Sequence, residues 1–280
     1  MAKEEITNLY RLPRGGELKA RLVRGESAIG SWIQFATPAN AEIMAAAGFE
    51  WLSIDLEHSV MSLEQAEGLI RTISNMGAVP LVRVSSNDPV QIKRVMDSGA
   101  GGIIVPMVKT IEDAERAVGA VRYPPSGYRG VGLARAQGYG AHFEEYRKWL
   151  DEESIVIVQI EHIEAVRNLP DIIQVKGVDG FLVGVYDLSG SLGVPGQLDH
   201  PLILEALAEI MRVAKEHPTI IPGFHVVPQR PDLVAEKIAE GYRLIAYSSD
   251  MLLLSEACQG GVRAMKKNGA WVQKSRRDGH

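Results

Sequence analysis

The segment IVIVQIE at positions 155–161 and the segment GFLVGVYD at positions 180–187 carry the pattern that predicts the fold. Each begins with a short, continuous apolar run and ends in a carboxylate, Glu161 or Asp187. An apolar run without alternation is typical of a strand that is buried on both faces, as in a parallel sheet covered by helices. Residues 162–179 separate the two runs and are numerous enough for the crossover helix that parallel strands require.

The same succession of apolar runs and amphipathic stretches extends over most of the chain. Eight such runs in 280 residues favour a closed (β/α)8 TIM barrel over an open doubly wound sheet, which more often has fewer strands and a phosphate loop after the first. We therefore predict an α/β barrel with buried parallel strands. The predicted strands are 28–35, 51–55, 79–84, 102–108, 155–161, 180–185, 219–226 and 243–248. The predicted helices are 39–47, 63–76, 89–98, 111–121, 163–175, 201–217 and 231–240.

The chain is predicted to form one domain. Residues 1–27 are an N-terminal lead whose short helix closes the bottom of the barrel, residues 28–262 are the catalytic barrel, and residues 263–280 are a tail. Residues 122–151 separate two strands by more than one helix, and we expect this long loop to cover the site. Many of the 28 glycines are expected to be structural, because several end a helix just before a strand, where left-handed geometry is favoured. These are Gly48, Gly77, Gly99, Gly177 and Gly241.

Composition excludes several classes of function. Thirty basic and 35 acidic residues are well mixed and leave a net charge of −5, so no basic stripe is available for nucleic acid. No run approaches the ~18 apolar residues of a membrane-spanning helix, which argues against a membrane protein. The one cysteine, Cys258, cannot form an internal disulfide, and the sequence has no glycosylation sequon. We expect a cytoplasmic protein.

Polar residues follow the predicted strands, and the carboxyl ends of barrel strands meet at one end of the barrel. Glu161 and Asp187 follow neighbouring strands, so their carboxylates should converge. Two carboxylates, completed by water and carbonyl oxygens, suit Mg²⁺ or Mn²⁺. The alternative is that Asp187 caps a helix.

A second group of charged residues ends the second and third predicted strands. Asp55 is close enough to His58 to hold its imidazole in one tautomer, which favours a general base. Arg83 ends an apolar strand and should face an anion, either a developing enolate or an internal partner, Glu57 or Asp55.

The other chemistries have weaker signals. No predicted strand contains a lysine for a Schiff base, and there is no GxSxG nucleophile elbow. Metal-assisted enolate chemistry is the best physical fit. A hypothesis of another class is a non-catalytic barrel that binds an oxo acid, although a binder would not need a paired Asp55 and His58.

Motifs in one consistent order resemble the HpcH/HpaI family of class II, metal-dependent pyruvate aldolases over about residues 17–257. The motifs are Ile54-Asp55-Leu56-Glu57-His58, Val82-Arg83, Asn87-Asp88-Pro89-Val90-Gln91-Ile92-Lys93, Val105-Pro106-Met107-Val108, Arg122-Tyr123-Pro124-Pro125, Arg129-Gly130, Val158-Gln159-Ile160-Glu161 and Asp187-Leu188-Ser189.

The resemblance implies a phosphoenolpyruvate/pyruvate-type TIM barrel that cleaves a 4-hydroxy-2-oxo acid reversibly to pyruvate and an aldehyde. It implies a divalent metal ion (Mg²⁺, Mn²⁺ or Co²⁺), bound by Glu161 and Asp187, and no organic cofactor. Arg83 would stabilise the enolate oxygen, and His58, paired with Asp55, would move the proton at the aldol hydroxyl.

The resemblance also implies a substrate pocket and an assembly. Gln159 would line the pyruvate pocket, and the backbone amides of Gly184, Val185, Tyr186 and Asp187 would hold the substrate carboxylate. Asp97 would reach the site of a neighbouring subunit in a homo-hexamer, a trimer of dimers with exchanged C-terminal helices.

The sequence departs from the family where the aldehyde would bind. Val185-Tyr186 replaces a common Pro-Ala, and His225 stands where an apolar residue is usual. The alternative within the fold is oxaloacetate decarboxylation followed by carbon–carbon bond formation, similar to macrophomate synthase, which uses the same enolate.

Overall fold

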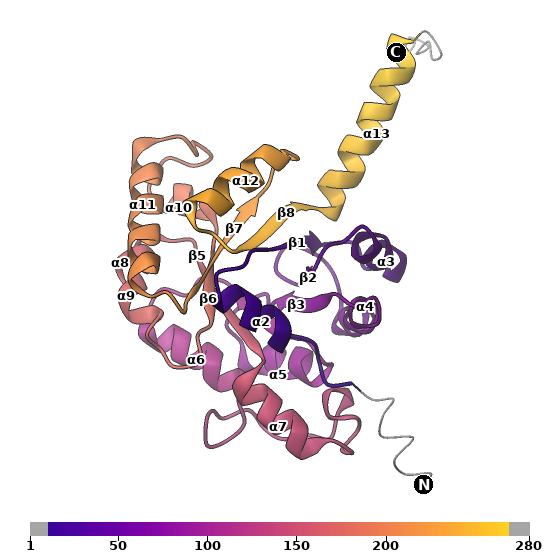
Figure 1. Cartoon of the computed structure of the whole chain (residues 1–280), viewed down its shortest axis with the longest axis vertical. Coiled ribbons are helices and arrows are strands. Elements are labelled where there is room, and N and C mark those ends of the chain that lie inside the picture. Colours follow the sequence, from indigo (N-terminus) through magenta and orange to yellow (C-terminus); the bar gives the residue numbers. More distant parts are fainter. Residues whose placement is uncertain (1–10, 269–280) are drawn as a thin grey trace, which may run out of the picture.

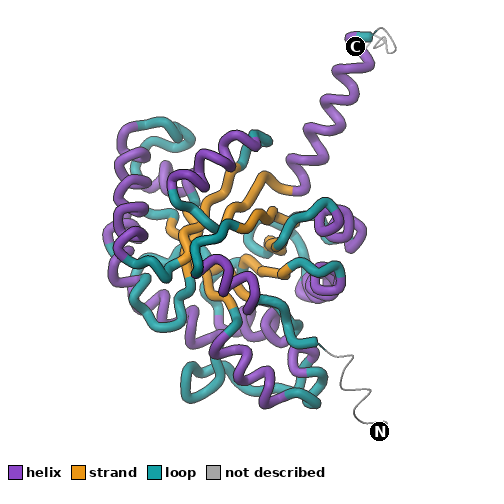
Figure 2. The backbone as a smooth tube through the Cα atoms, viewed as in Figure 1, coloured by secondary structure: helices purple, strands orange, loops and turns teal. Residues whose placement is uncertain are grey.

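A computed structural model describes residues 11–268 and confirms the predicted barrel. Eight parallel strands pair in chain order, and β8 closes the sheet against β1. Figures 1 and 2 show the strands at the centre with helices around them. The strands are β1 (Ala28–Ile33), β2 (Trp51–Asp55), β3 (Val79–Arg83), β4 (Gly102–Val105), β5 (Ile155–Ile160), β6 (Gly180–Val183), β7 (Ile221–Val226) and β8 (Leu244–Ser249).

The helices lie where the amphipathic stretches predict them, with one division. The predicted helix 163–175 is two short helices, because Pro170 has no N–H and fits only the first turn of a helix. Two helices were not predicted: α7 (Phe143–Glu152) lies at the end of the long segment 122–151, and α10 (Val185–Ser191) begins two residues after the end of β6. The helices are α2 (Gly16–Val23), α3 (Pro38–Ala46), α4 (Leu63–Asn75), α5 (Pro89–Asp97), α6 (Ile111–Val121), α7 (Phe143–Glu152), α8 (Ile163–Arg167), α9 (Leu169–Ile172), α10 (Val185–Ser191), α11 (Pro201–Glu216), α12 (Pro231–Glu240) and α13 (Asp250–Lys267), with a 3-10 turn, η1 (Arg135–Gln137).

The long segment 122–151 is at the wrong end of the barrel for the predicted role. It follows helix α6 rather than strand β4, so it starts at the amino-terminal ends of the strands. Its α7 places Trp149 against Gly15, just before α2. The expectation that this segment covers the site is therefore wrong, and Gly130 and Gly132 do not border it.

Two apolar cores stabilise the barrel. The larger one lies between the sheet and its helices. The smaller one fills the barrel interior, and Leu18 and Leu22 of α2 belong to it. The N-terminal helix therefore closes the bottom of the barrel, as predicted.

The five glycines predicted to end helices have φ between +92° and +112°, the left-handed region. The prediction of structural glycines is confirmed at these positions.

Gly30 in β1 is required for a different reason, close packing. A Cβ at this position would overlap the ring and the carbonyl oxygen of Trp51, which is fully buried. We expect Gly30→Ala to lower the free energy of unfolding by about 2–3 kcal/mol. Gly68 in α4 has no atom within 4 Å of the same position, so Gly68→Ala is expected to raise stability by about 0.5–1 kcal/mol. Urea unfolding of both variants measures the difference, and equal stabilities would contradict the packing argument.

Helix α13 leaves the body of the barrel (Figure 1). It runs through position 262, so the predicted division between barrel and tail falls inside a helix. The remainder of the predicted tail, from residue 269, and the first ten residues of the lead lie outside the described residues. Within residues 11–268, no helix is long and apolar enough to cross a membrane.

Candidate active site

A cavity of about 350 Å³ opens at the carboxyl ends of the strands. Most of the predicted site residues line it, together with residues from β1, β7 and α13. Glu161 borders it, because Gly184 and Gln159 both lie against the Glu161 side chain. The predicted residues that line the cavity are Asp55, His58, Arg83, Gln159, Gly184, Val185, Tyr186 and Asp187.

Asp55 and Arg83 form an ion pair with two hydrogen bonds. The register of β2 against β3 pairs the two residues, so both side chains leave the sheet together. Arg83 donates from Nε to Asp55 Oδ1 at 2.9 Å and from Nη2 to Oδ2 at 2.7 Å. Burial alone would raise the pKa of Asp55, but the hydrogen bonds and charge of Arg83 outweigh it and lower the pKa. Asp55 is therefore a carboxylate that fixes the guanidinium.

The structure does not contain the predicted contact between the Asp55 carboxylate and the His58 imidazole. Asp55 Oδ1 instead accepts hydrogen bonds from the backbone N–H groups of Glu57 and His58, both at 3.1 Å. This turn directs the imidazole outward, where 60% of the side chain is exposed and Nε2 lies 3.9 Å from Glu57 Oε2. Asp55 shapes the turn that carries His58 rather than holding its ring.

Glu57 is a site residue that the sequence prediction treated only as an ion partner. Its Oε2 lies 3.3 Å from Arg83 Nη1 and forms no hydrogen bond with the described residues. Burial raises the pKa of Glu57 to about 7, and the charges of Glu161, Asp55 and Asp187 add to that rise against the opposing effect of Arg83. Its place two residues after a strand end was the signal in the sequence.

Glu161 is held by the backbone of a neighbouring strand end. Met107, just after β4, has φ of +55°, a strained conformation for a residue with a side chain. Its N–H donates to Glu161 Oε1 at 2.6 Å, and Gln159 Nε2 donates to Oε2. Burial raises the pKa of Glu161, and the charge of Asp187 adds to this, although both hydrogen bonds oppose it. The charge of Arg83 also opposes the rise, but burial dominates, so the carboxylate is oriented and its negative charge is only partly compensated.

Asp187 lies on the first turn of α10. The N-cap of this helix is Gly184, so the alternative in which Asp187 caps the helix is wrong. Gly184 leaves room for Glu161, because a Cβ at this glycine would lie 2.8 Å from Glu161 Oε2. The Gly184 N–H donates to the Ile160 carbonyl, which leaves the next three N–H groups for a substrate.

The donor set fits a divalent cation. The charges of Glu161 and Asp187 raise the pKa of Glu57, and the charge of Asp187 raises the pKa of Glu161, so a cation among these carboxylates would oppose both effects. Gln159 Oε1 is buried without a hydrogen-bond partner among the described residues. In residues 11–268, no three His, Cys, Asp or Glu side chains group closely enough to ligate a metal by themselves. A metal here would need water or substrate oxygens to complete its coordination.

Trp32 and His225 also line the cavity. The guanidinium carbon of Arg83 lies 4.2 Å from the centre of the Trp32 ring, a cation–π contact. The His225 and Trp32 ring centres are 5.6 Å apart. Burial lowers the pKa of His225 to about 4, so its ring is neutral at pH 7.

Asp97 does not lie at the site of its own chain. It ends α5 and pairs with the buried Arg129 at 3.1 Å. Arg129 also donates to the hydroxyl groups of Tyr123 and Tyr146. The motif around Arg122 and Arg129 is thus structural within this chain.

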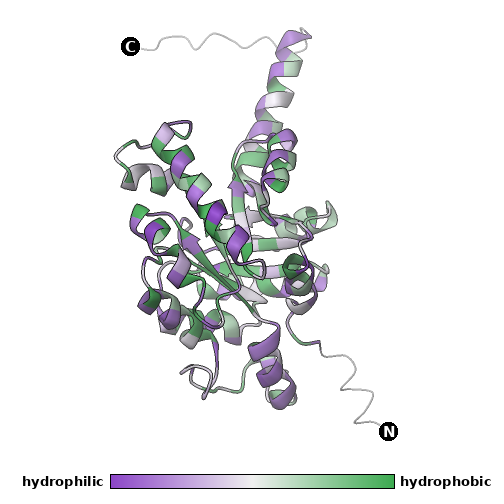
Figure 3. Cartoon of the chain, turned by 60° about the vertical axis from the view of Figure 1, so that its left-hand side comes forward, coloured by the Kyte–Doolittle hydropathy of each residue, from purple (hydrophilic) through white to green (hydrophobic). Residues whose placement is uncertain are grey.

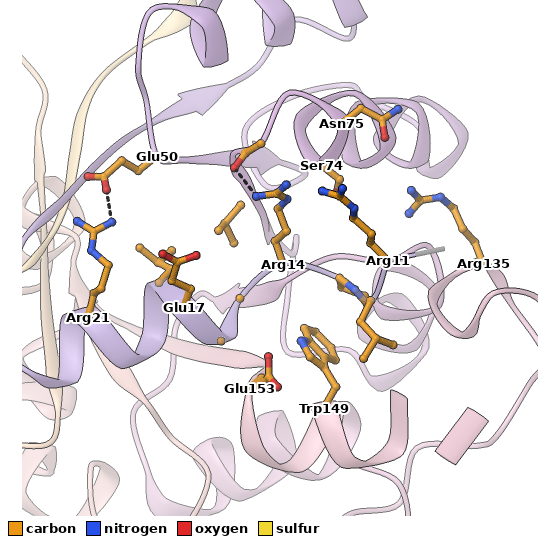
Figure 4. Close-up of a pocket in the computed structure, with 18 residues that line it drawn as sticks. Arg11, Arg14, Glu17, Arg21, Glu50, Ser74, Asn75, Arg135, Trp149 and Glu153 are labelled. Atoms are coloured by element: carbon orange, nitrogen blue, oxygen red, sulfur yellow. Dashed lines mark hydrogen bonds and ion pairs between the residues drawn. The ribbon is translucent and has the colours of Figure 1, made fainter. Parts of the chain in front are cut away.

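A larger cavity, about 820 Å³, is at the opposite end of the barrel, and Figure 4 shows the residues that line it. Its arginines serve the fold: Arg14 donates to the carbonyl of Gly77 at 3.2 Å, and Arg135 donates to that of Ser98 at 2.7 Å. Both carbonyls end a helix, where cations are stabilising. Arg21 pairs with Glu50 at 2.5 Å. The carboxyl ends of the strands do not reach this cavity, so the smaller one is the candidate active site.

Comparison with known proteins identifies relatives of this chain. The HpcH/HpaI aldolase/citrate lyase family model matches residues 28–257. The chain is 37% identical over 243 residues to 4-hydroxy-2-oxo-heptane-1,7-dioate aldolase of Escherichia coli, covering 86% of this chain and 91% of that one. It is 35% identical over 264 residues to 2-keto-3-deoxy-L-rhamnonate aldolase of Escherichia coli O9:H4 (strain HS), covering 92% and 96%. A HpcH/HpaI aldolase/citrate lyase family protein of Burkholderia cenocepacia J2315 has a similar structure, with a TM-score of 0.84, 31% identity and coverage of 90% and 99%.

Proposed function

The chain belongs to the HpcH/HpaI aldolase/citrate lyase family, and from this membership we propose that it is a metal-dependent aldolase that cleaves a 4-hydroxy-2-oxo acid to pyruvate and an aldehyde. The observation that carries the proposal is the set of like-charged carboxylates beside a fixed guanidinium at the carboxyl end of the barrel. Glu161 and Asp187 would hold the divalent metal, Mg²⁺, Mn²⁺ or Co²⁺. When bound, the metal would polarise the 2-oxo group and stabilise negative charge on the enolate oxygen.

Arg83 stabilises the enolate oxygen with the N–H groups of its guanidinium that are not fully engaged in contacts with Asp55 and Glu57. Its Nε and Nη2 are directed at Asp55, and Nη1 lies beside Glu57 without a hydrogen bond. A guanidinium held in this way needs little reorganisation as charge develops on the substrate.

His58 acts as the acid and base at the 4-hydroxyl group. It takes the hydroxyl proton as the carbon–carbon bond breaks and returns it in the reverse addition. Because the imidazole is exposed in the single chain, we propose that a water molecule carries this proton.

The pyruvate half lies between β5 and the start of α10. Gln159 lines this part of the cavity, and the N–H groups of Val185, Tyr186 and Asp187 receive the substrate carboxylate. Gly184 contributes by its small size rather than by its N–H group.

We propose a homo-hexamer, a trimer of dimers, in a cytoplasmic protein. Helix α13 stands clear of the barrel and carries apolar as well as polar residues (Figure 3). Four of its large apolar residues are exposed in the single chain. These residues are Met251, Leu252, Leu254 and Met265. An exchanged helix would cover them, and Asp97 would complete the site of a neighbouring subunit. The single, exposed Cys258 supports a compartment without disulfides.

Proton exchange in pyruvate tests the function. We expect the methyl protons to exchange with deuterium in the presence of Mg²⁺, Mn²⁺ or Co²⁺, and removal of the metal by a chelator to slow exchange about 1000-fold. Proton NMR of pyruvate measures the rate. His58→Ala should retain metal binding but lose aldol addition. Absence of exchange with every metal would overturn the proposal, and release of CO₂ from oxaloacetate without aldol addition would favour the decarboxylase alternative.

A further inference from the structure

His225 lies near the end of β7 and lines the cavity together with residues of β1 and α13. Its ring packs against Trp32. Nothing in the proposed metal and enolate chemistry uses His225.

The tautomer of His225 follows from one contact. Nε2 lies 3.0 Å from the carbonyl oxygen of Ser248, and a carbonyl oxygen only accepts, so Nε2 carries the hydrogen. Ser248 has φ of +54°, a strained conformation that presents this carbonyl to the ring. Arg83 and Asp55 are the charged groups that face the ring, and their effects on it oppose each other.

The other ring nitrogen is therefore a hydrogen-bond acceptor. In a neutral imidazole with hydrogen on Nε2, Nδ1 carries a lone pair. Nδ1 has no hydrogen-bond partner among residues 11–268, and the side chain lines the cavity. A lone pair accepts from a hydroxyl group and repels a carboxylate.

The charges of the residues that line the cavity also favour a hydroxyl group over a carboxylate. Among the described residues that line it, the cationic side chain is Arg83, and Asp55 and Glu57 already surround its guanidinium. The cavity thus offers a neutral acceptor in company with the apolar side chains of Val227, Met251 and Leu252, and the described residues that line it include no lysine and no second arginine for a distal carboxylate.

We propose that His225 is a specificity-determining residue whose Nδ1 accepts a hydrogen bond from a hydroxyl group on the aldehyde half of the substrate. The enzyme then prefers hydroxylated 2-oxo acids, built from hydroxyaldehydes, to those with an alkyl chain or a distal carboxylate. This inference rests on the proposed aldolase function.

A matched pair of aldehydes tests it. Glycolaldehyde and propionaldehyde differ by a hydroxyl group in place of a methyl group, and succinic semialdehyde carries a distal carboxylate. We expect wild-type kcat/KM for pyruvate addition to be highest with glycolaldehyde. His225→Leu should lower the ratio of kcat/KM with glycolaldehyde to kcat/KM with propionaldehyde about tenfold, because one hydrogen bond to a substrate hydroxyl contributes about that much. His225→Gln, which keeps an amide donor for Ser248 and an acceptor oxygen, should restore part of it.

Two controls separate the possible failures. Pyruvate proton exchange needs no aldehyde, so its absence in wild type would overturn the function itself. If exchange occurs in wild type but propionaldehyde or succinic semialdehyde is preferred, the role of His225 is wrong. If His225→Leu has the same ratio of the two kcat/KM values as wild type, the proposed role of His225 is also wrong. If His225→Leu does not fold, the proposal is tested by the aldehyde preference of wild type and by the ratio of kcat/KM with glycolaldehyde to kcat/KM with propionaldehyde in His225→Gln.

Discussion

Replacing Arg83 with alanine is expected to slow metal-dependent proton exchange in pyruvate by about three orders of magnitude, the upper range for loss of one donor to an oxyanion. The guanidinium lines the cavity, and its contacts with Asp55, Glu57 and the Trp32 ring hold it in place. Arg83→Lys should recover little, because an ammonium group cannot make the two parallel hydrogen bonds to Asp55.

Loss of Arg83 should also destabilise the barrel. Asp55 is fully buried, and only 12% of the Arg83 side chain is exposed. Removing one partner of such a pair costs about 3–5 kcal/mol, because the remaining charge stays buried. Thermal unfolding therefore has to accompany the exchange assay.

Arg243→Ala is the matched control for this experiment. Arg243 is also half-buried next to a strand, but it lies before β8 at the other end of the barrel and donates to the Pro218 carbonyl at 3.1 Å. We expect this variant to lose stability but to keep exchange within about threefold, since surface and remote changes rarely alter the site. If Arg83→Ala at a temperature where it is folded also stays within tenfold of wild type, Arg83 has no part in enolate stabilisation.

The fold could be predicted from the sequence because strands that are buried on both faces form continuous apolar runs separated by amphipathic helices. All eight apolar runs are strands of the barrel. The predicted ends of the strands were less accurate. The run 102–108 is a strand only as far as Val105, because Pro106 has no N–H to donate to the sheet and Met107 adopts a positive φ. That turn is what carries the N–H to Glu161, so the local departure from regular structure serves the site.

The candidate site was only partly readable, because a strand-end position shows where a residue lies and not what it contacts. Asp250 follows β8 as Asp187 follows β6, but its carboxylate accepts from the N–H groups of Gln34 and Phe35, both at 2.9 Å. Asp55 likewise contacts the backbone of His58 rather than its ring. The length of segment 122–151 alone predicts a cover over the site, but the segment follows helix α6 and therefore lies at the amino-terminal ends of the strands.

Glu161→Gln is expected to affect metal binding and folding in opposite directions: it should weaken metal binding without lowering the stability of the metal-free protein. Without metal, the variant should be at least as stable as wild type, because the buried carboxylate has a raised pKa and faces the charge of Asp187. Metal affinity should fall by at least about 100-fold, as loss of even an outer partner of a ligand costs 10–100-fold.

The measurement is the thermal midpoint with and without Mn²⁺. A ligand that binds only the native state raises the midpoint by mass action, so Mn²⁺ should stabilise wild type and leave Glu161→Gln unchanged. Glu164→Gln, three residues further on and on the exposed side of α8, should respond to Mn²⁺ as wild type does. An equal Mn²⁺ response in wild type and Glu161→Gln would mean that the metal binds elsewhere. A variant that is much less stable than wild type without metal would mean instead that the Glu161 charge is structural, held by Met107 and Gln159 for the barrel rather than for a cation.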